Sequence, residues 1–183
     1  MPAEHLQHYV GANCQYPLWC LANVFDVSTG IPGRVWAQEC FTASTTAPPL
    51  VVRRVGFMLA QVIGVPASPA IEIYLHDGQG PAQLVEARPI DPGQLVAPGH
   101  NQIVLEPPIL VPAASFCVGL VGGDPDGSSL GIAVDVPSIA PDRSFLKLDS
   151  VWECDSQQWL DVDDINPNPE GAWCIDAEVE PAG

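Results

Sequence analysis

Short apolar runs separated by proline and glycine constrain this chain more than any other feature. The 183 residues include 20 prolines and 16 glycines, and most of these stand between the apolar runs. Both residues weaken a helix from inside, whereas both are typical of turns. No long segment has the 3.6-residue period of an amphipathic helix. The pattern therefore predicts an all-β chain of short strands joined by turns.

Alternation of apolar and polar residues locates the strands. In residues 70–76 three apolar side chains alternate with Glu72, Tyr74 and His76, as in a strand with one buried face. Further strands are expected at residues 34–42, 50–65, 102–105, 115–121, 130–136, 144–148, 151–153 and 172–180. Strands of this length and spacing predict a two-sheet antiparallel jelly-roll sandwich at 34–183. Residues 1–33 are expected to form a disulfide-bearing N-terminal extension or docking arm.

Six cysteines place the chain in an oxidising compartment. They stand at positions 14, 20, 40, 117, 154 and 174, without a CxxC pair and without histidine at metal-ligand spacing. An even number in this pattern favours disulfides over a zinc site. We expect the pairs Cys14–Cys20, which are close in sequence, Cys40–Cys174, on the first and last sandwich strands, and Cys117–Cys154, on strands expected to be neighbours. Six cysteines allow many other pairings, so the connectivity is open.

The expected location is extracellular or on the cell surface. The first six residues are polar and contain no apolar core of a signal peptide, so we expect a leader that was removed or another export route. No stretch approaches roughly 20 consecutive apolar residues, and membrane insertion is not expected.

Charge excludes two classes of partner. The chain has 22 acidic and 6 basic residues and a net charge of −16. This field repels the phosphates of nucleic acids and of anionic lipids. No nucleic-acid partner is therefore expected.

Several motifs follow one another in a recurring order. They are Arg54-Val55-Gly56-Phe57, Ile71-Glu72-Ile73-Tyr74, Ser115-Phe116-Cys117-Val118-Gly119-Leu120, Gly131-Ile132-Ala133-Val134-Asp135, Arg143-Ser144-Phe145, Trp152 and Gly171-Ala172-Trp173-Cys174-Ile175. In this order they resemble the galactose-binding-like, carbohydrate-binding jelly-roll modules of secreted or surface-anchored bacterial proteins. The resemblance implies a sandwich that binds a glycan or a cell-surface polymer. Binding residues vary within this class, so the resemblance identifies no site residue.

No catalytic centre is recognisable. The chain lacks a GxSxG elbow, and we interpret its histidines, at positions 5, 8, 76 and 100, as polar surface residues. A serine hydrolase requires serine, histidine and a carboxylate that converge, and nothing in the sequence indicates this. We predict that the protein is not an enzyme.

One acidic loop is a candidate Ca²⁺ site. It supplies six side chains with oxygen ligands, which are Asp161, Asp163, Asp164, Asn166, Asn168 and Glu170. Ca²⁺ takes about six to eight oxygen ligands. The loop departs from the EF-hand pattern because its fifth position is Ile165. The alternative is a solvated acidic loop that contributes only to solubility.

Tryptophan is the other candidate binding element. Trp159 lies beside the acidic loop and is either an exposed platform for a sugar ring or a hydrophobe that covers a loop. With it, Gln157, Tyr74 and His76 complete the candidate ligand-binding set. Trp173 and Trp152 are expected in the core.

The leading hypothesis is an extracellular, non-catalytic binding or adhesion module for carbohydrate or another cell-surface component. The alternative is a structural subunit of an extracellular filament, sheath or capsid. In that case the N-terminal arm would add a strand to a neighbouring copy, and the protein would self-associate.

Overall fold

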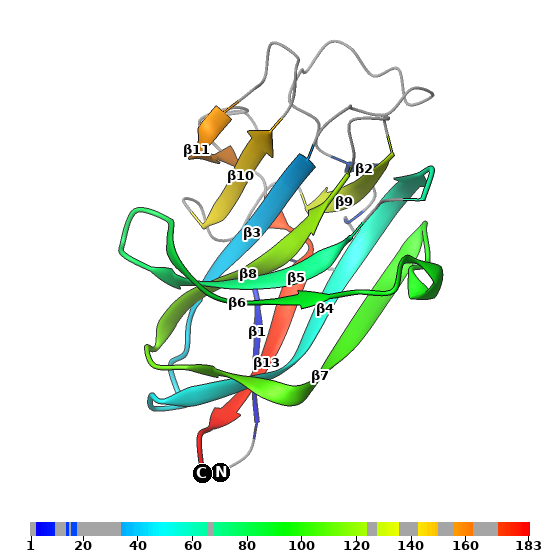
Figure 1. Cartoon of the computed structure of the whole chain (residues 1–183). Helices are drawn as coiled ribbons and strands as arrows, with labels where there is room; N and C mark the ends of the chain where they lie inside the picture. Colours follow the sequence, from blue (N-terminus) through cyan, green and yellow to red (C-terminus); the bar gives the residue numbers. More distant parts are fainter. Residues whose placement is uncertain are drawn as a thin grey trace.

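The protein is a sandwich of two antiparallel sheets (Figure 1). The computed structural model describes residues 3–9, 14, 16–17, 34–65, 68–123, 128–135, 143–149, 156–162 and 172–183. Within these ranges no helix is long and apolar enough to cross a membrane. The described residues form strands in two antiparallel sheets, which confirms the predicted all-β, two-sheet antiparallel sandwich.

Two sheets share the strands almost equally. The first contains, in spatial order, β1 (Glu4–Gln7), β13 (Ile175–Pro181), β4 (Leu50–Ile63), β9 (Ser129–Asp135) and β12 (Ala172–Trp173), with β7 (Gly99–Val111) paired to β4 and β2 (Tyr16–Pro17) paired to β9. The second contains β11 (Ser156–Asp161), β10 (Ser144–Asp149), β3 (Arg34–Thr42), β8 (Ser115–Gly122), β5 (Ala70–His76) and β6 (Pro81–Pro89). A short 3-10 turn, Pro92–Gln94, lies between β6 and β7. We call the first sheet the seven-stranded sheet and the second sheet the six-stranded sheet.

The strands β3 and β5 begin and end where the sequence predicts. The strand expected at 102–105 is longer, because β7 continues through Pro107 and Pro108. The register of β4 and β7 is interrupted opposite this stretch, between Val52 and Arg54. Proline lacks the amide donor of a regular ladder and is tolerated at such irregularities.

Besides β1 and β2 in the N-terminal extension, two strands of the six-stranded sheet, β6 and β11, were not expected from the sequence. Both lie at the edges of the six-stranded sheet, and β6 is mostly exposed, with polar residues among its side chains. An exposed edge strand does not require apolar alternation, so periodicity alone does not detect it.

The core lies between the sheets. Its largest fully buried side chains include Trp173, Phe41, Phe57, Phe116 and Leu50. The prediction that Trp173 belongs to the core is confirmed. Trp152 lies outside the described residues.

The described part of the N-terminal extension belongs to the sandwich. Strand β1 pairs with β13, so that the two termini lie side by side (Figure 1). The Glu4 carboxylate accepts the backbone N–H groups of Ser44, Thr45 and Thr46. Burial alone would raise the pKa of Glu4, but these hydrogen bonds outweigh it and lower that pKa to about 2. Residues 18–33 lie outside the described ranges, so docking through an arm stays a prediction.

The predicted disulfide pairs are wrong. The described bridges join Cys14 to Cys174 and Cys40 to Cys117, so Cys14–Cys20, Cys40–Cys174 and Cys117–Cys154 do not form. Cys40 and Cys117 are directly opposite each other in β3 and β8. Cys174 lies between β12 and β13 of the seven-stranded sheet, whereas Cys40 lies in the six-stranded sheet. Cys20 and Cys154 lie outside the described residues.

Candidate functional site

The strand register sets rows of side chains on the outer face of the six-stranded sheet. Residues directly opposite each other in antiparallel strands project to the same face. One row contains Asp161, Phe145, Gln38, Gly119 and Glu72. The row on one side of it contains Lys147 and Trp36, and the row on the other side contains Cys40, Cys117 and Tyr74. This face therefore combines aromatic, cationic and acidic groups.

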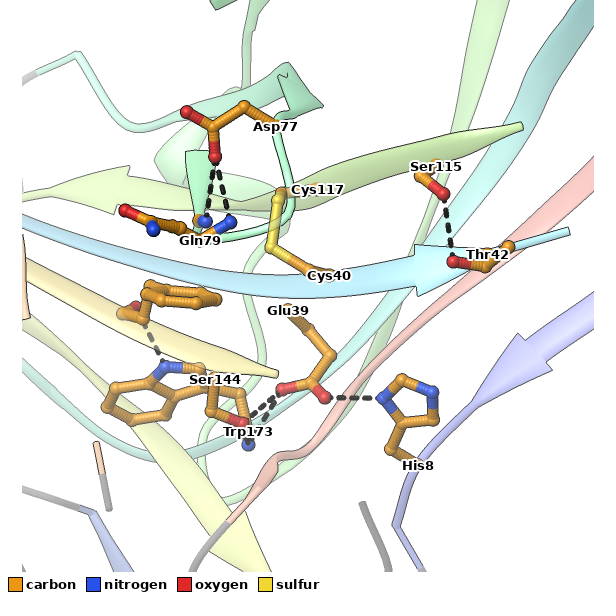
Figure 2. The surroundings of a disulfide bond; sticks show 12 residues. His8, Glu39, Cys40, Thr42, Asp77, Gln79, Ser115, Cys117, Ser144 and Trp173 are labelled. Atoms are coloured by element: carbon orange, nitrogen blue, oxygen red, sulfur yellow. Dashed lines mark hydrogen bonds and ion pairs between the residues drawn. A yellow bond between two sulfur atoms is a disulfide. The ribbon is translucent and has the colours of Figure 1, made fainter. Parts of the chain in front are cut away.

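Part of this face is covered. The Cys40–Cys117 bridge and Phe145 are buried together, with Tyr74 and Trp159 packed against them. The turn that joins β5 to β6 contributes to the cover, because a Cβ at Gly80 would lie 3.0 Å from the Phe145 ring. Asp77 holds this turn by accepting the backbone N–H groups of Gln79 and Gly80 (Figure 2).

Two cations and three partly exposed aromatic rings form a patch on this face. We call Arg34, Trp36, Tyr74, Lys147 and Trp159 the aromatic–cationic patch. The Lys147 Nζ atom lies 4.9 Å from the ring centroid of Trp36 and 5.8 Å from that of Trp159. The Arg34 Cζ atom lies 5.4 Å from the Trp36 centroid. One ammonium group thus connects two indole rings.

Tyr74 connects the patch to a carboxylate. Its ring packs edge-on against Trp159, with centroids 5.4 Å apart and an interplanar angle of 80°. Its hydroxyl donates a hydrogen bond of 2.7 Å to Glu72. Burial and this carboxylate raise the pKa of Tyr74, although Arg34 opposes the shift. The hydroxyl therefore stays neutral, and Trp159 is held between Tyr74 and Lys147.

His76 lies at the end of β5, with its ring centroid 6.5 Å from that of Phe145. Burial lowers the pKa of His76, and the positive charge of Arg143 lowers it further. The imidazole is therefore neutral at physiological pH. A neutral ring can both donate and accept a hydrogen bond.

The structure brings part of the predicted ligand-binding set together. Tyr74 and Trp159 are in ring contact, and His76 follows Tyr74 by two residues on the same strand. Gln157 belongs to β11, and its side chain lies outside the description. Trp159 has features of both predicted alternatives. Its half-buried ring packs against Phe145 and the Cys40–Cys117 bridge, and part of the ring stays exposed. A role of these residues in binding stays a prediction.

Sequence reasoning missed three members of the patch, which are Arg34, Trp36 and Lys147. The signal that would have found them is the two-residue period. Arg34, Trp36 and Gln38 alternate with the inward-facing residues of β3, and Phe145 and Lys147 do so in β10. Because β3 and β10 are far apart in the sequence, the two-residue period alone does not show that Trp36 and Lys147 are neighbours.

The predicted Ca²⁺ site falls mostly outside the described ranges. Asp161 ends β11 opposite Phe145. The other five candidates, Asp163, Asp164, Asn166, Asn168 and Glu170, lie beyond the description. Among the residues that are described, no group of three or more His, Cys, Asp or Glu side chains has a geometry that could hold a metal ion. Ca²⁺ binding by this loop stays a proposal.

A buried carboxylate lies on the inner side of β3. Glu39 is fully buried, and its two oxygens have different partners (Figure 2). The His8 Nδ1 atom is 2.7 Å from one oxygen. The Ser144 hydroxyl donates to the other at 2.5 Å, and the backbone N–H of Trp173 donates to it at 3.2 Å. His8, which the sequence interpretation treated as a surface residue, is therefore tied to the core.

This cluster is not arranged as a catalytic triad. A nucleophilic serine donates its proton to a histidine, which is itself oriented by a carboxylate. Here the Ser144 hydroxyl donates to Glu39 directly, and His8 contacts the other oxygen of the same carboxylate. The cluster joins β3, β10 and the N-terminal segment, which is a structural role. The absence of enzymatic activity stays a prediction.

Replacing Glu39 by glutamine should flatten part of the pH dependence of stability. Burial raises the pKa of Glu39 to about 7, although hydrogen bonds from His8 and Ser144 oppose burial. The protonated Glu39 side chain stabilises the folded state in full below the ordinary carboxyl pKa, and this stabilisation is lost as the pH rises through 7. Relative to Glu39→Gln, the wild type should lose about 2 kcal/mol of unfolding free energy between pH 5 and pH 7.

Urea unfolding at a series of pH values measures this difference. Glu106→Gln, at an exposed position of β7, is the matched control and should leave the curve of the wild type unchanged. A constant difference between Glu39→Gln and wild type across this range would contradict the assignment.

Comparison with solved structures found chains with the same fold. One is the crystal structure of the cysteine protease and lectin-like domains of Cwp84, a surface layer associated protein of Clostridium difficile. It has a TM-score of 0.58 and 10% identity, and the match covers 82% of this chain and 33% of that one. Another is a variant of the clostridial cysteine protease Cwp84 after propeptide cleavage, with a TM-score of 0.60, 10% identity and coverages of 83% and 37%.

The present chain thus spans about a third of the length of these neighbours. No family model and no curated protein matches its sequence. At 10% identity the likeness concerns the fold alone. The chain has the sandwich fold found in a bacterial surface protein.

Proposed function

We propose that this protein is an extracellular, non-catalytic module that binds carbohydrate on the outer face of its six-stranded sheet. The observation that carries the proposal is the edge-on contact of Tyr74 with Trp159, next to Trp36, on a partly exposed face. Aromatic rings supply a large apolar surface at low conformational cost, and the apolar face of a sugar ring stacks on such a surface. Both rings are held in place by neighbours, which reduces the entropy lost on binding.

Two further observations support the proposal. The bridges Cys14–Cys174 and Cys40–Cys117 are typical of proteins outside the cytoplasm. The fold is shared with a surface layer associated protein whose structure includes a lectin-like domain. A module of this kind would bind or adhere to a glycan or another polymer of a cell surface.

Removal of the Trp159 ring is the direct test. On a glycan array, the wild-type protein should bind a defined set of sugars. Trp159→Ala should weaken binding to those sugars about tenfold or more, whereas Trp159→Phe should retain part of the affinity because a phenyl ring also stacks. The melting temperatures of both variants show whether the sandwich is intact.

The matched control is Leu110→Ala. Leu110 is an exposed apolar residue on β7 of the other sheet, and its removal should leave binding unchanged. If the wild-type protein binds no glycan, or if Trp159→Ala binds as well as Leu110→Ala does, this assignment of the binding face is wrong.

A further inference from the structure

The few cations of this protein are unevenly distributed. Against 22 acidic residues the chain has only six basic ones. Among the described residues, Arg53, Arg54 and Arg88 form ion pairs with Glu180, Glu178 and Glu86. Arg34 and Lys147 have no such pair within the described structure and lie over the rings of the aromatic–cationic patch. Arg34 and Lys147 therefore lie together on the face proposed to bind carbohydrate.

From this juxtaposition we propose that the ligand is an anionic saccharide, whose carboxylate or phosphate group binds Lys147 and Arg34 while a sugar ring stacks on the neighbouring aromatic rings. This inference rests on the proposed function and adds the chemical class of the ligand. A cation that lies over an aromatic ring can still donate hydrogen bonds through the N–H groups that do not face the ring. Lys147 and Arg34 can thus hydrogen-bond an anion without leaving Trp36.

Two of the acidic neighbours lie outside the row of Lys147. Glu72 and Asp161 lie in the row of Gln38, whereas Arg34 lies four residues before Gln38 on β3, and Lys147 lies in the row between. Glu72 is nearly buried and accepts the Tyr74 hydroxyl. The register also places Asp149 opposite Arg34, so the anionic group would bind mainly at Lys147, one row away from Glu72 and Asp161.

Net charge opposes the ligand only at long range. The Debye length is about 8 Å at physiological ionic strength, so distant carboxylates are screened, whereas cations in contact with the ligand are not. A charge-assisted hydrogen bond is roughly twice as strong as a neutral one. A short oligosaccharide is the right probe, because a long polyanion would also meet the acidic remainder of the surface.

The test is isothermal titration calorimetry with the full chain at physiological salt. The probes are an oligogalacturonate of about four sugars, its methyl ester, which has the same rings without charge, and a phosphorylated mannose oligomer. We expect at least one of the two anionic probes to bind about tenfold or more tightly than the methyl ester. The stronger of the two identifies carboxylate or phosphate as the recognised group.

The variant Arg34→Gln with Lys147→Gln should lose this preference for charge while its melting temperature stays near that of the wild type. The control Arg53→Gln, with Arg53 on the seven-stranded sheet, should keep the preference. Equal binding of the ester and both anions, or an equal effect of the control, would overturn the inference. If the ester alone binds, the proposed function stands without this inference. If no probe binds and the glycan array is blank, both fail.

Discussion

Gly119→Ala is expected to destabilise the protein by about 3 kcal/mol or more. Gly119 lies in β8 at the centre of the six-stranded sheet, opposite Gln38 of β3 and Glu72 of β5. A Cβ at this position would collide with the carbonyl oxygen of Ala37 and lie 2.8 Å from the Cα atom of Gln38. Both are backbone atoms of the neighbouring strand, so no side-chain rotation relieves the contact. The strands β3 and β8 would have to separate.

Thermal unfolding by circular dichroism measures the loss, which should be roughly 10 °C in melting temperature for a domain of this size. Gly93→Ala is the control. Its nearest heavy atom would be a carboxylate oxygen of Asp91, the exposed end of a side chain that can move, at 3.2 Å. The control should stay within about 0.5 kcal/mol of wild type. Equal melting temperatures for Gly119→Ala and Gly93→Ala would show that the close approach of β3 and β8 is wrong.

Removal of the Cys14–Cys174 bridge should cost about 4 kcal/mol. The two cysteines are 160 residues apart in the sequence, so the bridge closes a long loop and restricts the unfolded chain strongly. It also connects the segment after β1 to the bend before β13, where the Cys174 carbonyl accepts the backbone N–H of Met58. The double variant Cys14→Ala with Cys174→Ala should unfold at a lower guanidinium concentration than wild type.

Peptide mapping under non-reducing conditions checks the connectivity itself. It should recover one linked peptide with Cys14 and Cys174 and another with Cys40 and Cys117. Hydrogen exchange should show faster exchange of the β1 amides in the double variant, because β1 would keep only its pairing with β13 and its side-chain contacts. Recovery of a Cys14–Cys20 peptide would contradict the structure and restore the original expectation.

The fold class follows from the sequence because it depends on local patterns. The alternation in 70–76 places Ile71 and Ile73 in the core and Glu72 and Tyr74 on the outer face, and the structure agrees. Proline and glycine mark many of the turns. Each of these signals depends on residues that are neighbours along the chain, so no tertiary information is needed to interpret them.

The candidate site follows from the sequence only in part. Trp159 and Tyr74 were predicted from their residue types alone. Their ring contact joins β11, at one edge of the six-stranded sheet, to β5, which lies next to the other edge strand. The contributions of Trp36 and Lys147 depend on β3 and β10 being neighbours in register. Residue type can nominate a group, but only the register decides which groups share a face.

The sequence by itself determined that this protein is an all-β sandwich with oxidised cysteines, because strand alternation, turn residues and an even cysteine count are properties of the chain alone. The tertiary structure alone decided the disulfide partners and the position of His8 beside Glu39. Both depend on contacts between residues far apart in the sequence. Many strand orders bury the same apolar faces, so the local pattern leaves such contacts open, and only the packing of the two sheets selects one set of them.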